Sequence, residues 1–328
     1  MSYLLPGAVA FFAACGHAAV ALAQVPAYPA KPIRIVVPFP SGGFSDTLGR
    51  LIGQKLSESL GQPVVNDNRP GASGTIGGEL VAKSAPDGYT LLTASLNYVV
   101  KPNIEKLPYD TQKDFAAVSL VAQGPPLVLV VRAASAYRTL SDIVADGRAH
   151  PGKLTFASAG PGSSGHLTAE LLRSLAGINI VQVPYKGSVL GVTATISGEV
   201  AVAASYLPVV LPLVKSGRLR GVALTSPTRS PLLPEVATAA EAGYPGCEVG
   251  GMMGLVAPAG TPRNIIRKLN AALAAIVARP DFVELLEGYG MQASALSPED
   301  FERYISEQIV RWGKVLKNGN ALPAGEKR

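Results

Sequence analysis

The chain is poor in the residues that build metal centres and disulfide frameworks. Its 328 residues include two cysteines and three histidines. Cys247 has no cysteine or histidine near it in the sequence, and His150 and His166 lie well before it. Because a protein-bound metal needs several such ligands together, we expect no metal site.

Charge is also scarce. Only 16% of the residues are charged and 48% are hydrophobic, which favours a folded globular protein, and the length allows two lobes. The net charge of +6 is spread along the chain. No run of Lys and Arg is interleaved with aromatic residues, so we exclude nucleic acid as a partner.

The first thirty residues carry no charge at all, and Lys31 is the first charged side chain. Their apolar stretch ends in small residues at 21–23, directly before Gln24, a pattern typical of signal-peptide cleavage. Two glycines and a histidine interrupt the stretch, whereas a membrane-spanning helix needs about 20 apolar residues in succession. We predict a signal peptide over residues 1–23 and a periplasmic mature protein.

The predicted leader contains one of the cysteines, Cys15. Phe12 stands where a lipoprotein signal usually has leucine, so we do not expect a lipid anchor at Cys15. Cys247 is then the single thiol of the mature chain, and a single thiol cannot form an internal disulfide.

The motifs of common enzyme classes are missing. There is no Walker A loop, and the glycines around Ser164 lack the G-x-S-x-G spacing of a nucleophile elbow. The stretch GPGSSG at 160–165 has dinucleotide-binding spacing, but the acid required about 20 residues later is absent, and the next one is Glu199. We therefore expect no catalytic residue, no cofactor and no enzymatic activity.

Strand-like and helix-like stretches alternate along most of the chain. Residues 32–39 predict a strand, and 45–61 predict an amphipathic helix that ends at Gly61. Later strands are predicted at 153–160 and 178–187, and residues 219–226 complete the second set. This rhythm is typical of an α/β fold in which helices flank mainly parallel sheets.

The alternation falls into two comparable sets, which predict two lobes. We assign residues 28–124 plus 251–328 to lobe 1 and 125–250 to lobe 2, with a ligand cleft between them. Apolar stretches at 125–131 and 252–258 predict the strands that cross between the lobes. Two C-terminal helices complete lobe 1, and Thr261 is expected to cap the first of them.

Glycine- and serine-rich turns follow strands in both sets. Ser41–Gly42–Gly43 and Ser163–Ser164 each precede a predicted helix. Backbone N–H groups at a helix start are unsatisfied and carry a partial positive charge, so such turns suit an anion. Because the carboxyl ends of parallel strands lie at one edge of a sheet, the two turns are expected to face each other across the cleft. Each turn taken singly is also compatible with a simple tight corner.

Eight successive segments resemble one family. They read YPAKPIRIVVPFPSGGFSDTLGR, NRPGASGTIG, SAPDGYTLL, LPYDTQKDFAAVSLVA, FASAGPGSSGHL, VPYKG, LTSPTRSPLLPEVATAAEAGYPG and GLVAPAGTP. In this order they resemble the extracytoplasmic solute-binding proteins of tripartite tricarboxylate transporters, the Bug family. The resemblance implies a type II-like two-lobe periplasmic binding protein. It also implies capture of a small organic carboxylate and its delivery to membrane permease subunits.

The resemblance also implies a set of ligand-binding residues. Those in lobe 1 are Ser41, Gly42, Gly43, Phe44, Ser95 and Asn97, and those in lobe 2 are Ser158, Ser163, Ser164, His166, Tyr185, Lys186, Gly187 and Ser205. Asp46 is expected to serve the start of its helix rather than the ligand. Where family members often carry acidic residues, this chain has Ala201 and Ser205, which argues against a ligand with an ammonium group.

A receptor for uptake is the leading hypothesis, and we expect it to be a monomer. A ligand sensor that feeds a membrane signalling system is a second hypothesis, and the sequence is compatible with both. A hydrolase or cofactor enzyme is a third, which the missing motifs disfavour.

Overall fold

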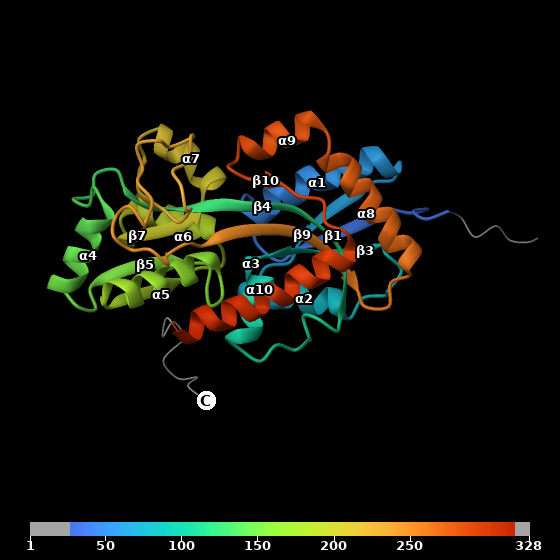
Figure 1. Cartoon of the computed structure of the whole chain (residues 1–328), viewed down its shortest axis with the longest axis horizontal. Coiled ribbons are helices and arrows are strands. Elements are labelled where there is room, and N and C mark those ends of the chain that lie inside the picture. The colour runs from blue at the N-terminus through green and yellow to red at the C-terminus, as the bar shows by residue number, and fades with distance from the viewer. Residues whose placement is uncertain (1–26, 319–328) are drawn as a thin grey trace, which may run out of the picture.

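The computed structural model describes residues 27–318, which form two α/β lobes joined through one continuous sheet (Figure 1). The predicted signal peptide and Cys15 lie outside these residues. Strands run in the order β2-β1-β3-β9-β4-β7-β5-β6, and β8 and β10 pair with β4 off this path. No helix within residues 27–318 has the length and hydropathy needed to span a membrane.

Each lobe contains three parallel strands. In the first lobe they are β1 (Ile33–Val37), β2 (Val64–Asn68) and β3 (Thr90–Ser95). In the second lobe they are β5 (Leu154–Ser158), β6 (Ile180–Pro184) and β7 (Val202–Tyr206). The apolar run that predicted a strand forms β1, and its place between two parallel neighbours explains why it is almost fully buried.

Two long strands cross between the lobes. They are β4 (Phe115–Arg132) and β9 (Gly250–Pro258), which pair with each other in antiparallel fashion (Figure 1). Strand β4 also pairs antiparallel with β8 (Leu219–Leu224) in the second lobe and with the short β10 (Gln292–Ala293) in the first. The prediction that residues 219–226 complete the second parallel set is wrong, because β8 pairs with the crossing strand and not with a βαβ neighbour.

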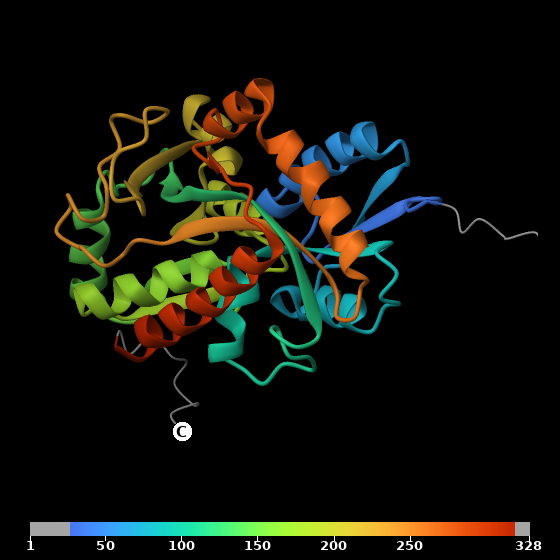
Figure 2. The same cartoon turned by 45° about the vertical axis from the view of Figure 1, so that its right-hand side comes forward.

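Helices cover the sheet in both lobes. Those of the first lobe are α1 (Phe44–Leu60), η1 (Ala72–Gly74), α2 (Thr75–Ala82), α3 (Leu96–Val100), η2 (Lys101–Asn103), α8 (Arg263–Val277), α9 (Pro280–Glu287) and α10 (Pro298–Asn318). Those of the second lobe are α4 (Leu140–Ala149), α5 (Ser164–Ala176), α6 (Ser188–Ser197) and α7 (Leu207–Lys215). The last helix, α10, packs on β4 and α3 and extends toward the second lobe (Figure 2).

Helix termini show how local sequence shapes the lobes. Helix α1 ends at Gly61, which adopts the left-handed conformation (φ 67°) that the sequence predicted. The cap predicted at Thr261 is wrong: Pro262 occupies the N-cap position of α8, and no side chain caps it. The Thr261 hydroxyl instead donates to the Pro258 carbonyl at 2.7 Å, which closes the turn after β9.

Candidate functional site

A small cavity of about 60 Å³ lies between the lobes. It is built where five strands end and five helices begin, after β1, β3, β5, β6 and β7. Eight of the residues expected at a ligand site line it: Gly43, Phe44, Ser95, Asn97, Ser163, Ser164, Gly187 and Ser205. The structure thus brings together side chains and turns that are distant in the sequence.

Helix N-termini dominate the walls of this cavity. Helices α1, α5, α6 and α7 start from Gly43, Ser163, Gly187 and Tyr206, which all line it. Gly43, Gly187 and Tyr206 provide no side-chain cap, so the first N–H groups of those helices lack one. None of the described residues that line the cavity is charged. An anion in this cavity would meet helix N-termini and no cationic side chain of the described lining.

Ser205 adds an unused polar group at the end of β7. It is only 1% exposed, it lines the cavity, and its hydroxyl has no hydrogen-bond partner among the described residues. Leaving a buried hydroxyl unpaired costs about 1–3 kcal/mol. The hydrogen-bonding capacity of the Ser205 hydroxyl is therefore unused by the described residues.

A short hydrogen-bond chain fixes the polar group after β3. The Ser95 hydroxyl donates to Asn97 Oδ1 at 2.6 Å, and Asn97 Nδ2 donates to the Ser73 carbonyl at 2.9 Å. Ser95 and Asn97 are both buried and both line the cavity. The Asn97 amide is thus held in one orientation before any ligand binds.

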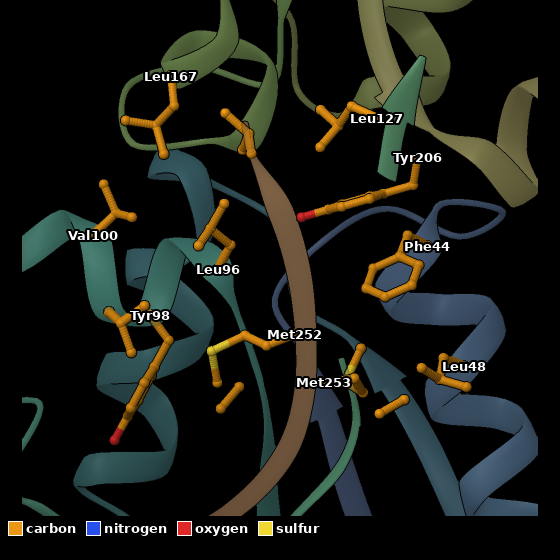
Figure 3. Close-up of a cluster of buried hydrophobic side chains, with 14 of the residues drawn as sticks. Phe44, Leu48, Leu96, Tyr98, Val100, Leu127, Leu167, Tyr206, Met252 and Met253 are labelled. Atoms are coloured by element: carbon orange, nitrogen blue, oxygen red, sulfur yellow. The ribbon is translucent and has the colours of Figure 1, made fainter. Parts of the chain in front are cut away.

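Two aromatic rings meet across the cleft. The rings of Phe44 from lobe 1 and Tyr206 from lobe 2 have centroids 4.3 Å apart and a tilt of 37° (Figure 3). Burial raises the pKa of the Tyr206 hydroxyl to about 12, with the Ser164 side chain opposing the shift. Tyr206 therefore stays neutral at physiological pH. The pair forms an uncharged apolar wall on one side of the cavity.

Asp46 organises the loop that leads into α1. Its carboxylate accepts hydrogen bonds from the Gly42 N–H at 2.9 Å, from Arg50 Nε at 3.1 Å and from Asn68 Nδ2 at 2.9 Å. Burial alone would raise the pKa of this carboxyl, but the hydrogen bonds from Arg50, Gly42 and Asn68 outweigh it, and the pKa is lowered. The expectation that Asp46 serves the helix start is confirmed.

This use of Asp46 changes the role of the first loop. The Gly42 N–H is already engaged, and Gly42 lines a neighbouring groove rather than the cavity. Ser41 is exposed and lies outside the cavity. Of the three loop residues, only Gly43 faces the site.

Four expected residues of the second lobe also lie outside the cavity. The Ser158 hydroxyl accepts from the Gly160 N–H, and His166 lies buried in the first turn of α5, where burial lowers its pKa. Tyr185 and Lys186 line a separate interlobe groove, and the Tyr185 hydroxyl donates to Glu199 at 2.7 Å. Ser158 and Tyr185 therefore make contacts within their own lobe, and Tyr185 and Lys186 lie in a groove apart from the cavity.

The cavity has further walls that were not expected. They are Phe39, Pro40, Ser45, Leu96, Ala159, Ser188, Val189 and Leu190. Most are apolar residues next to an expected polar one, and in sequence they are indistinguishable from core positions. Their position in the sequence is the signal that could have found them. Residues next to a turn that follows a strand lie in the cleft together with that turn.

The sequence and fold of the chain match those of known proteins. A family model described as "Tripartite tricarboxylate transporter family receptor" matches residues 48–321. The chain belongs to this receptor family. The receptor is 37% identical to BugT of Bordetella pertussis over 324 residues, which cover 98% of each chain. The resemblance to the Bug family is therefore confirmed.

Solved structures confirm the two-lobe periplasmic binding protein fold of the receptor. The structure of the R. palustris protein Rpa4515 with adipate has 35% identity and a TM-score of 0.85, and the match covers 89% of this chain and 98% of that one. MatC from Rhodopseudomonas palustris with bound malate has 33% identity and a TM-score of 0.83, with 88% and 100% covered.

Proposed function

We propose that the receptor captures a small organic carboxylate without a cationic group and delivers it to the permease subunits of a tripartite tricarboxylate transporter. One observation carries the proposal: four helix N-termini converge on a cavity whose described lining holds no charged side chain. Backbone N–H groups satisfy a carboxylate, whereas an ammonium group would lie unpaired beside the same dipoles.

Further parts of the proposal follow from the family and the ligand chemistry. The receptor works in the periplasm as a monomer, releases its ligand unchanged and needs no cofactor. Malate and adipate in the related structures are both carboxylates without an ammonium group. Gly43, Ser163, Ser164 and Gly187 present N–H and hydroxyl donors to the carboxylate, and Ser205 and Asn97 contact the rest of the ligand.

We also propose a hinge in the crossing strands, which would allow capture by closure. The register between β4 and β9 shifts between Gln123 and Pro126, and Gly124 has a φ of +85° there. Pro126 is paired with Gly250, the first residue of β9. We place the lobe boundaries at 124/125 and 250/251, where an interrupted ladder lets one lobe rotate against the other.

Calorimetric titration of the mature chain, residues 24–328, tests the proposed function. The panel contains succinate, malate, adipate and benzoate, with aspartate and glutamate as amino counterparts. We expect at least one acid without an ammonium group to bind, and mass spectrometry to recover it unchanged. Failure of every acid to bind, tighter binding of the amino acids, or chemical turnover would each overturn the proposal.

A further inference from the structure

The loop before α2 is the most strained segment of the described chain. Residues Gly71, Ala72, Ser73 and Gly74 all have positive φ, at 140°, 45°, 50° and 97°. Ala72 and Ser73 are the only non-glycine residues between 27 and 318 with this conformation. Such strain persists only where surrounding contacts enforce it, and it gathers at sites that bind or switch.

Buried side chains of lobe 1 hold the loop in its positive-φ conformation through hydrogen bonds. Lys101 is 2% exposed, and its ammonium group donates to the Ala72 carbonyl and the Thr75 hydroxyl and pairs with Glu105 at 2.7 Å. Asn97 Nδ2 donates to the Ser73 carbonyl. Lobe 1 thus holds the backbone of the loop through two of its carbonyl groups, those of Ala72 and Ser73.

The Ser73 side chain reaches the other lobe. The Ser73 hydroxyl donates to the Ala159 carbonyl at 3.0 Å, and Ala159 lines the ligand cavity in the turn between β5 and α5. The fit is close, since a Cβ on Gly160 would lie 2.4 Å from Ser73 Oγ. A Cβ on Gly162 would lie 2.7 Å from a carbon of the Lys101 side chain. The strained loop and its buried lysine therefore both pack against the β5–α5 turn.

We propose that Ser73 is a positioning residue that latches the lobes together and couples closure to the ligand cavity through Asn97. Asn97 takes part in both events, because its side chain lines the cavity and also holds the Ser73 carbonyl. A ligand that contacts Asn97 stabilises the loop in its latching shape. The Ser73–Ala159 bond then fixes the turn that carries Ser163 and Ser164 over the ligand. This inference rests on the proposed function.

Distances between spin labels measure the latch directly. Cysteines replace Lys113 in lobe 1 and His150 in lobe 2, whose side chains are 83% and 63% exposed, and Cys247→Ser removes the native thiol. We expect the ligand-free protein to show a short and a long distance population. Ser73→Ala should raise the open-to-closed ratio about three- to tenfold, as expected for one lost hydrogen bond.

Two control variants distinguish loss of the latch contact from a general loss of stability. The Ser84 hydroxyl donates to the Leu80 carbonyl at 2.8 Å within lobe 1, so Ser84→Ala removes a comparable bond and should leave the ratio unchanged. Gly160→Ala attacks the contact from the other lobe and should open the protein as Ser73→Ala does. Gly243→Ala is its control, because Gly243 has a similar φ of +94° and a Cβ there would have no atom within 4 Å.

The outcomes distinguish this inference from the proposed function. If no acid of the panel binds, the proposed function fails, yet the ligand-free distances still test the latch. If acids bind and Ser73→Ala has the distance populations of wild type, the latch is wrong and the proposed function stands. A wild type with only the open population, with and without acid, would also overturn the latch.

Discussion

The turn after β1 and the turn after β5 look alike in sequence, since both place glycine and serine before a helix. They differ in how their helix starts are satisfied. In α5 the Ser163 hydroxyl accepts from the His166 N–H at 3.2 Å, so the helix caps itself. In α1 the N-cap is Gly43, which has no side chain, and Asp46 caps the loop upstream instead.

The difference shows that two similar turns present different donors to one cavity. The α1 turn offers backbone N–H groups, because its N-cap residue Gly43 is buried and no side chain caps the helix. The α5 turn offers hydroxyls, of which the one on Ser163 also accepts from the His166 N–H of its own helix. We infer that the α1 turn contributes more of the binding free energy and the α5 turn more of the local stability.

The largest effect is expected from Gly43→Leu. A leucine side chain would fill the cavity and block the α1 N-terminus, so affinity for the best acid should fall about 100-fold, or about 2.7 kcal/mol. Folding should be less affected, because Gly43 has an ordinary φ of −83° and the nearest atoms to a Cβ are 3.7 Å away. Calorimetric titration and urea unfolding check both parts. Gly43→Ala is the control. Unchanged affinity in the leucine variant would show that this turn has a structural role and does not bind the ligand.

Ser205→Asp extends the comparison to a third strand end. An added carboxylate in this uncharged cavity should weaken a dicarboxylate about tenfold to 30-fold by like-charge repulsion. The same variant should narrow the preference for succinate over aspartate, because the new acid can pair with an ammonium group. A thermal-shift panel of amino acids and their deaminated analogues measures this. Wild-type protein that is stabilised more by aspartate than by succinate would contradict our interpretation of Ser205.

Asp46→Ala tests the scaffold of the α1 turn. Loss of the acceptor for Gly42, Arg50 and Asn68 should lower the free energy of unfolding by about 2 kcal/mol at neutral pH. Because the pKa of Asp46 is lowered in the folded protein, its ionisation contributes stability that is fully present above the unfolded pKa of about 4 and lost as the pH falls through the lower folded pKa. Urea unfolding at several pH values should show the variant and wild type converging in acid. A difference that grows in acid would contradict this account.

The smallest effect is expected from Ser163→Ala in the α5 turn. Removing this cap should cost about 1 kcal/mol of stability. Affinity should change less than in Gly43→Leu, because the substitution removes one hydroxyl donor and adds no side chain that fills the cavity. Thermal unfolding and titration of the same preparation compare the two. An affinity loss as large as that of Gly43→Leu would mean that both turns bind the ligand equally.

Some of this site could be predicted from sequence because its signals are local. Gly43, Gly187 and Ser163 lie directly between a strand and a helix, and their neighbours show the periodicity that places them there. Other roles could not be predicted because they depend on partners far away in the chain. The pairing of Phe44 with Tyr206 across the cleft and the hydrogen bond from the Tyr185 hydroxyl to Glu199 are seen only in the structure.

The sequence by itself determined the α/β rhythm, the crossing strands and the family, because hydrophobic periodicity, turn residues and short motifs act over a few neighbouring residues. Only the tertiary structure decided which donors remain free in the cavity. Ser205 stays unpaired at the end of β7, and Ser73 reaches Ala159 in the other lobe. The Ser73–Ala159 contact depends on how the lobes meet through β4 and β9, and a contact between residues so far apart in the chain leaves no local pattern in the sequence.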